Sequence, residues 1–290
     1  MHAEPKGEPF DIRMMRHIFR RWPLLRGKGV LLKAFRPLLR DREFVCEVVD
    51  GVVVLADLSD WITLHGLVEG YDREFAMSWA FIRPGDTVID VGANIGIWTI
   101  AAAKKTGQQG QVHAFEPLEA NFGRLLHNID LNAATNVVPQ KLALSDRAGP
   151  RRFFPSPNMN SGVGRLVTDD WTGLHSTVEA VTLDDYCDQH GITSVGVLKI
   201  DVEGAEYFVL KGATRLLRSS DPPIIVFEMN REMAADLGSS PDKIETFLAA
   251  LGYSIFGYRG GKLNQISLCE FFGHEDLFAL PKHANRSLES

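Results

Sequence analysis

One segment decides the fold of this 290-residue chain, and from Thr87 to Thr99 it reads TVIDVGANIGIWT. Its first five residues are a short run rich in β-branched side chains, which predicts a buried parallel strand. Gly92 and Gly96 then allow a tight turn and the close approach of a ligand, and the following helix presents its first N–H groups there. We therefore expect a nucleoside to bind at this turn.

The turn differs from a phosphate-binding loop. No Lys-Ser/Thr pair follows the glycines, and their spacing is Gly-x-x-x-Gly instead of Gly-x-Gly-x-x-Gly. Asp90, at the end of the predicted strand, is an acceptor that suits an ammonium group and would repel a pyrophosphate. Glu116 ends the next predicted strand, where an acidic residue can accept both hydroxyls of a ribose. The sequence thus predicts a ligand with an intact ribose diol.

Five sequence strings between residues 89 and 206 carry a resemblance to a known family. They are Ile89–Gly96, Phe115–Pro117, Leu144–Asp146, Thr182–Tyr186 and Val197–Glu206. The chain resembles class I S-adenosylmethionine-dependent methyltransferases, and among them the FkbM type. The most specific string is KIDVEGAE at residues 199–206. The resemblance implies a Rossmann-like fold with S-adenosyl-L-methionine as the cofactor.

The resemblance also implies which residues contact the cofactor. The acidic residues Asp90, Glu116 and Asp201 belong to this set. The others are Tyr71, Glu74, Gly92, Ala93, Asn94, Gly96, Pro117, Ala143, Leu144, Ser145 and Asp146. In this view Ser145 and Asp146 bind the exocyclic amine of adenine, although the two residues also fit a plain turn after a strand. Tyr71 and Glu74 lie either at the mouth of the site or on an exposed helix face.

Strand and helix signals alternate through the middle of the chain, which predicts a parallel sheet covered by helices on both faces. Strands are expected at residues 87–91, 111–115, 137–144, 195–200 and 223–227, with an antiparallel pair from 253 onward. Helices are expected near residues 71–81, 95–105, 118–131, 183–190, 205–217 and 243–251. The predicted fold is α/β, a mostly parallel doubly wound sheet with an antiparallel edge strand.

A β-hairpin precedes this core, because two β-rich runs at 44–49 and 52–56 flank the turn signal Asp50-Gly51. Within the core, residues 146–178 are rich in Pro, Asn, Ser and Gly, which predicts a long irregular segment with one strand at 152–154. Such a segment is either an acceptor-binding lid or disordered.

Acidic residues at the ends of the fourth and fifth strands are the candidates for catalysis. Asp201 and Glu228 end these strands, and Asn230 follows two residues later. Carboxylate and amide oxygens suit a hard cation such as Mg²⁺, which would activate an acceptor hydroxyl. The set resembles the metal site of catechol-type and macrolide-sugar O-methyltransferases, with the departure that Met229 separates Glu228 from Asn230.

Two other roles are open for these carboxylates. Without a metal, Asp201 or Glu203 would act as the general base, and Glu228 would bind the acceptor or the methionine ammonium. In a structural role, Glu203 or Glu206 would cap the helix that follows. Lys199 lies inside a strand, which favours a paired structural charge over a catalytic amine.

The N-terminal 42 residues differ in charge from the rest of the chain. They hold eleven Lys and Arg against four Asp and Glu, whereas the remainder holds 20 against 33. The net negative charge of residues 43–290 argues against binding of nucleic acid. We therefore divide the chain into a basic helical extension, 1–42, and a methyltransferase domain, 43–290.

The extension contains an amphipathic basic segment. The apolar residues Met14, Met15, Ile18, Phe19, Trp22 and Leu25 share one side of a helical wheel, and Arg13, Arg16, His17 and Arg20 occupy the other. Its apolar side either packs on the domain or on a second subunit, or it binds an anionic membrane surface. Three widely separated cysteines and the absence of an 18-residue apolar run suggest a cytoplasmic protein, with peripheral contact to the inner face of a membrane as the alternative.

These observations lead to one functional hypothesis and two rivals. The chain is expected to be an O-methyltransferase acting on a hydroxyl of a sugar, glycolipid or polyketide-like metabolite. The first rival is a nicotinamide-dependent oxidoreductase, which the missing Gly-x-Gly-x-x-Gly turn disfavours. The second is a protein that binds S-adenosylmethionine and methylates nothing.

Overall fold

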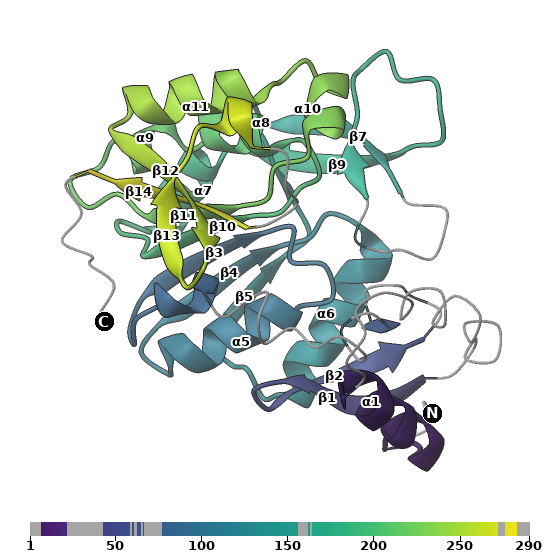
Figure 1. Cartoon of the computed structure of the whole chain (residues 1–290). Helices are drawn as coiled ribbons and strands as arrows, with labels where there is room; N and C mark the ends of the chain where they lie inside the picture. The colour runs from purple at the N-terminus through teal and green to yellow at the C-terminus, as the bar shows by residue number, and fades with distance from the viewer. Residues whose placement is uncertain are drawn as a thin grey trace.

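A computed structural model of the chain describes residues 7–21, 43–58, 60, 63–64, 66, 77–155, 162, 164–271 and 276–282. Its centre is an eight-stranded sheet in the order β13-β12-β14-β11-β10-β3-β4-β5 (Figure 1). The parallel strands are β3 (Thr87–Val91), β4 (Gln111–Phe115), β5 (Val137–Gln140), β10 (Val197–Ile200) and β11 (Ile224–Phe227). The remaining strands are β12 (Tyr253–Arg259), β13 (Lys262–Gln265) and β14 (Leu277–Pro281).

The strand order confirms the predicted doubly wound sheet. From β3 the chain proceeds outward to β4 and β5 and then returns to β10 on the other side of β3. The carboxyl ends of β3 and β10 therefore meet at the point where the order reverses, which is where ligands bind in open α/β sheets. β14 is antiparallel and lies between β11 and β12, and the antiparallel edge strand is β13.

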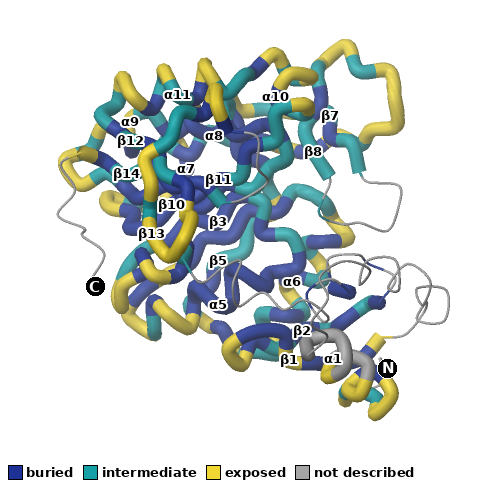
Figure 2. The backbone as a smooth tube through the Cα atoms, viewed as in Figure 1, coloured by how far each residue is buried: buried dark blue, intermediate teal, exposed yellow. Residues whose placement is uncertain are grey.

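Helices cover both faces of the sheet. One face carries α5 (Ile97–Thr106) and α6 (Glu119–Leu131), and the other carries α7 (Leu183–His190), α8 (Glu206–Lys211), α9 (Thr214–Leu217) and α11 (Pro241–Ala250) (Figure 1). Alternate residues of one strand enter the two cores, so that Val88 packs toward α5 and Ile89 toward the opposite face. Both faces of the central strands are buried, as Figure 2 shows.

A second sheet corrects two of the sequence predictions. Residues 137–144 do not form one strand, because β5 pairs with β4 whereas β6 (Ala143–Leu144) turns away to pair with β9 (Ser176–Val181). The segment 146–178, expected to be irregular apart from one strand at 152–154, contributes β7 (Gly149–Phe154), which contains that strand, together with β8 (Arg165–Leu166) and the start of β9 to the same four-stranded sheet. Its residues 156–161 and 163 lie outside the described part.

A third correction concerns the helix expected at 205–217, which is divided into α8 and α9. Gly212 lies at the junction, where a Cβ atom would approach the Ser145 carbonyl oxygen to 2.1 Å. The helix is therefore interrupted at Gly212, where the chain packs closely on the loop after β6.

The N-terminal hairpin is confirmed and belongs to the core. β1 (Glu43–Val49) and β2 (Val52–Asp57) pair around Asp50 and Gly51, whose φ values of 41° and 71° suit a two-residue hairpin turn. Buried residues of both strands share one apolar cluster with α5 and with Val88 of β3. The hairpin thus extends the α5 side of the fold.

The basic extension forms a helix where the sequence predicts one. The helix α1 (Phe10–Arg21) buries Ile12 in the same cluster as the hairpin, and Gly7 forms a bridge with Val45. Phe10 and Met14 remain 79% and 52% exposed. Trp22 and Leu25 of the predicted apolar side lie outside the described residues. No helix in the described part of the chain is long and apolar enough to cross a membrane.

Gly92 is fixed by both its conformation and its surroundings. Its φ of 85° is in the left-handed region, and a Cβ atom there would lie 1.8 Å from the Asp201 carbonyl oxygen. The first glycine of the turn therefore lets the loop after β3 pass directly against the end of β10.

We predict that Gly92→Ala lowers the free energy of unfolding by about 2 to 5 kcal/mol, from left-handed strain together with overpacking. Gly191 is a matched control, because its φ of 65° is in the left-handed region and a Cβ atom would meet nothing within 4 Å. Gly191→Ala should cost only about 1 to 2 kcal/mol. Urea denaturation of both variants measures the difference, and equal losses would contradict the assigned contact.

Candidate cofactor-binding and catalytic site

The turn between β3 and α5 is held by the end of β4. The N–H groups of Gly92 and Ala93 both donate to the Phe115 carbonyl oxygen at 2.9 Å, and Asn94 adopts a left-handed conformation with φ of 51°. Gly96 ends the turn as the N-cap of α5. The structure therefore brings the predicted turn directly beside Glu116, which follows Phe115.

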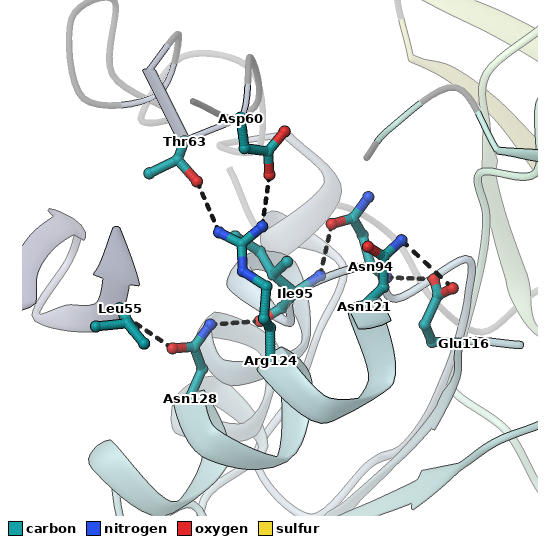
Figure 3. Close-up of polar contacts among 9 residues, drawn as sticks. All are labelled: Leu55, Asp60, Thr63, Asn94, Ile95, Glu116, Asn121, Arg124 and Asn128. Atoms are coloured by element: carbon teal, nitrogen blue, oxygen red, sulfur yellow. Dashed lines mark hydrogen bonds and ion pairs between the residues drawn. The ribbon is translucent and has the colours of Figure 1, made fainter. Parts of the chain in front are cut away.

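Glu116 is buried at this junction and accepts hydrogen bonds on both oxygens (Figure 3). Its Oε2 accepts from the Asn94 N–H at 3.0 Å, and its Oε1 accepts from the Leu118 N–H at 2.9 Å and from Asn121 Nδ2 at a longer 3.5 Å. Burial raises the pKa of Glu116 to about 7. The carboxyl group thus stands at the end of β4 with its protonation poised near neutral pH.

Asp90 makes its contacts within the protein. Thr99 Oγ1 donates to its Oδ2 at 2.6 Å, and Lys199 Nζ lies 3.7 Å from its Oδ1. Burial raises the pKa of Asp90, although Lys199 and Thr99 oppose this shift. The ammonium group that the structure places beside Asp90 is therefore that of Lys199.

Lys199 is a paired structural charge, as predicted. It is the direct neighbour of Asp90 across β3 and β10, its Nζ donates to Asp201 Oδ2 at 3.0 Å, and it lies 5.6 Å from the centre of the Trp98 ring. Burial alone would lower the pKa of Lys199, but Asp201 and Asp90 raise it above its usual value. Lys199 is therefore a cation bound between two carboxylates.

The residues expected near adenine lie after β6. Ala143, Leu144 and Ser145 are buried, and the Ser145 N–H donates to the Val181 carbonyl oxygen. Asp146 accepts from Lys211 at 2.9 Å, so one of its oxygens is already engaged. Pro117, by contrast, is half-buried beside Glu116. Tyr71 and Glu74 lie outside the described residues.

Three carboxylates gather at the ends of β10 and β11. Asp201 is bound by Lys199, and Glu203 accepts from Asn230 Nδ2 at 3.2 Å in a left-handed conformation with φ of 49°. Burial raises the pKa of Glu203 to about 7 and that of Glu228 to about 8, and the charge of Asp201 adds to both shifts. Within the described part of the chain, no hydrogen bond reaches the Glu228 carboxylate.

The structure does not support the expected metal ligands. Asn230 Oδ1 accepts from the Met233 N–H at 3.2 Å and so caps α10 (Arg231–Asp236), while its Nδ2 donates to Glu203. Among the described residues, no group of three or more His, Cys, Asp or Glu side chains is arranged to hold a metal ion. Asn230 is thus the N-cap of α10 and its side-chain amide is engaged on both atoms, so the role of Asp201, Glu228 and Asn230 as metal ligands stays a prediction.

Glu206 has the structural role that was one of the open alternatives. It is buried at the start of α8, and its Oε1 accepts from the Gly204 N–H at 2.8 Å. Burial raises the pKa of Glu206 to about 8.

Several polar residues that support the site were not predicted from the sequence. Thr99 contacts Asp90 from α5, and Asn121 contacts Glu116 from α6. Further along α6, Asn128 Nδ2 donates to the Ile95 carbonyl oxygen at 2.8 Å. Asn121, Arg124 and Asn128 are spaced so that they lie on one helix face, and this spacing in the sequence could have predicted a polar face on α6.

Comparison with known proteins identifies the family. The family described as "Methyltransferase FkbM domain" matches residues 90–255, which is more than half of the chain. The chain belongs to this family of methyltransferases. The matching region begins at Asp90 and ends within β12, and it therefore excludes the N-terminal hairpin.

Two curated relatives are 34% identical to this chain. One is the hexuronic acid methyltransferase AglP of Haloferax volcanii, matched over 46% of this chain and 52% of AglP. The other is the 31-O-demethyl-FK506 methyltransferase FkbM of Streptomyces tacrolimicus, matched over 49% of this chain and 64% of that protein. The chain therefore spans between half and two thirds of the length of these relatives.

Two further similarities have lower sequence identity. The 2-O-methyltransferase NoeI of Sinorhizobium fredii is 26% identical over 47% of this chain and 60% of NoeI. A SAM-dependent methyltransferase from Aquifex aeolicus, known from its crystal structure, covers 72% of this chain and 87% of its own, with 15% identity and a TM-score of 0.38. The fold assignment rests on the strand order in Figure 1.

Proposed function

We propose that this protein is an S-adenosylmethionine-dependent O-methyltransferase. The observation that carries the proposal is the buried Glu116 carboxyl group, which ends β4 and is joined to the glycine turn after β3. It supports the proposal together with membership of the FkbM methyltransferase family.

The residues at the turn fit the cofactor. A carboxylate has about four acceptor positions, and three donors occupy Glu116, the weakest of them Asn121 at 3.5 Å. A ribose hydroxyl would use the remaining position and replace the Asn121 contact. Bound S-adenosylmethionine would supply a sulfonium-activated methyl group for direct displacement by an acceptor oxygen.

The acceptor in this proposal is a hydroxyl group on a sugar, a glycolipid or a polyketide-like metabolite. The names of the relatives support this range, since they refer to a hexuronic acid, to a position on FK506 and to a 2-O position. The second sheet, β6 to β9, lies beside the carboxyl ends of the parallel strands of the large sheet (Figure 1). It would form one wall of the acceptor site.

Glu228 is the best candidate for the general base. Asp201 is engaged by Lys199 and Glu203 by Asn230, whereas no hydrogen bond from a described residue reaches the Glu228 carboxylate. Its pKa of about 8, raised by burial and by Asp201 and Glu203, suits proton removal near neutral pH. Asp201 and Glu203 would then orient the acceptor and keep the Glu228 pKa high.

The rival functions make different predictions in one assay. Purified protein would be incubated with methyl-labelled S-adenosylmethionine and with a panel of uronic acids, glycosides and macrolide alcohols. The proposal predicts a labelled methyl ether on at least one acceptor. Binding of the donor without transfer to any acceptor in the panel would favour the non-catalytic alternative.

The role of Glu116 predicts how cofactor affinity depends on pH. Ionised Glu116 accepts the ribose hydroxyls, so affinity should rise as pH increases through about 7, the pKa to which burial raises this group. Glu116→Gln cannot ionise, and it should weaken binding by about 2 to 3 kcal/mol and remove the pH dependence. Calorimetry between pH 6 and 8 measures both effects.

The matched control for this test is Glu119→Gln. Glu119 begins α6, is exposed, and pairs only with Lys141 among the described residues. Its variant should keep the wild-type affinity and pH profile. A Glu116→Gln protein that retains both would reject the assignment of the ribose site.

The role of Glu228 predicts a metal-independent reaction with a basic pH profile. Glu228→Gln should lower kcat by about 100-fold to 10,000-fold, the usual contribution of a general base, and leave cofactor affinity nearly unchanged. The wild-type rate should rise with pH toward about 8, because the ionised form is the active one. A chelator should have no effect on the wild-type rate. Loss of activity in chelator, restored by Mg²⁺, would instead indicate a metal-dependent reaction.

We further propose that the basic extension places a cytoplasmic enzyme against the anionic inner face of a membrane. Phe10 and Met14 of α1 are exposed although they are apolar, and Arg13 lies on the same helix.

The full chain should then sediment with vesicles that contain anionic lipid and be released at high salt. Phe10→Ser/Met14→Ser should weaken this binding without changing activity on a small acceptor. Binding that is equal with neutral vesicles would contradict the proposal, and a second subunit bound through α1 would appear as a dimer in solution.

A further inference from the structure

The polar face of α6 joins the N-terminal hairpin to the cofactor turn. It consists of Asn121, Arg124, Asn128 and Asn132, which follow one another at helical spacing along α6 and its C-cap (Figure 3 draws the first three). Asn121 contacts Glu116, and Arg124 binds Asp60 at 2.7 Å and Thr63 at 3.1 Å. This face therefore contacts both the site and the segment that follows the hairpin.

Two asparagines of this face cover the free edge of β2. Asn132 Oδ1 accepts from the Val53 N–H at 2.9 Å and its Nδ2 donates to the Val53 carbonyl oxygen, while Asn128 Oδ1 accepts from the Leu55 N–H at 2.9 Å. These backbone groups would otherwise bind a third strand. The side-chain amides of α6 thus take the place of a strand in holding the hairpin.

Asn128 alone of these two also reaches the cofactor turn. Its Nδ2 donates to the Ile95 carbonyl oxygen at 2.8 Å, and its side chain is fully buried. Ile95 lies between Asn94, whose N–H is bound by Glu116, and Gly96, which caps α5. One amide group therefore links the hairpin backbone to the middle of the turn.

We propose that Asn128 is a positioning residue for cofactor binding and that it makes the hairpin β1–β2 part of the cofactor site. The hairpin precedes residue 90, where the family match begins, whereas Asn128 lies within the matched region. The hairpin binds the Asn128 side chain through its Oδ1 atom, and the Nδ2 atom of the same side chain holds the backbone of Ile95. The proposal rests on the proposed function, since the turn must bind S-adenosylmethionine for its position to matter.

A pair of variants in the full chain separates positioning from general stability. Asn128→Ala removes a contact to the hairpin and the contact to the turn, whereas Asn132→Ala removes contacts to the hairpin and to the Asn128 carbonyl oxygen but none to the turn. Both should lower the melting temperature. Asn128→Ala should weaken S-adenosylmethionine binding by about tenfold, the effect of one lost hydrogen bond, and raise its KM with kcat at saturation within about twofold. Asn132→Ala should leave the affinity within about twofold of wild type.

Two results of this comparison would overturn the inference. Either Asn128→Ala binds S-adenosylmethionine as tightly as wild type, or both variants lose affinity equally. Wild-type protein that does not bind S-adenosylmethionine at all would overturn the proposed function as well, so the two failures are distinguishable.

Hydrogen exchange on the wild-type chain tests the same link if Asn128→Ala does not fold. Because coupling between two sites is reciprocal, S-adenosylmethionine should slow exchange of the Val53 and Leu55 amides. The distant hairpin β12–β13 serves as the internal control and should be unaffected. Exchange at Val53 and Leu55 that does not change on binding would contradict the link.

Discussion

The site depends on the ion pairs that the buried ammonium group of Lys199 makes with Asp90 and Asp201. This group lies beside Asp90 of β3 and binds Asp201 at the end of β10, at the point where the strand order reverses. A buried cation that loses a partner is strongly destabilising, so the two strands and their carboxylates form one unit. At the same place a Cβ atom on residue 92 would collide with the Asp201 carbonyl oxygen, so the close packing of the two strand ends requires glycine. A charge cluster and a glycine thus fix the ends of β3 and β10.

This arrangement divides the acidic residues by task. Asp90 and Asp201 compensate Lys199, Glu206 holds the backbone before α8, and Glu203 is bound by Asn230. Glu116 and Glu228 lie on the two sides of β3 and β10, because they follow β4 and β11, and burial raises their pKa values to about 7 and about 8. In the proposed reaction one side holds the ribose of the donor and the other removes the acceptor proton. A cationic donor placed between them would favour ionisation of both.

The sequence predicted those parts that depend on local pattern. The strands at 87–91 and 111–115, the helix at 183–190 and the Asp50-Gly51 hairpin are found at or within a residue of the predicted bounds. Features that depend on partners distant in sequence were missed or misassigned. The pattern from 137 to 144 could not show that its second half pairs with β9, and the sequence around Asn230 did not show that its side chain contacts Met233 and Glu203. Asp90 suited an ammonium group, and the structure supplies that group from Lys199, 109 residues later.

The central claim is that the crevice binds S-adenosylmethionine through an acidic, ribose-accepting turn. Calorimetric titration of the full chain with S-adenosylmethionine and, separately, with NAD tests it most directly. We predict binding of one S-adenosylmethionine per chain, because Glu116 accepts a ribose diol, and no binding of NAD, because the turn lacks the glycine spacing for a pyrophosphate. Saturable binding of NAD, or no binding of S-adenosylmethionine, would contradict it.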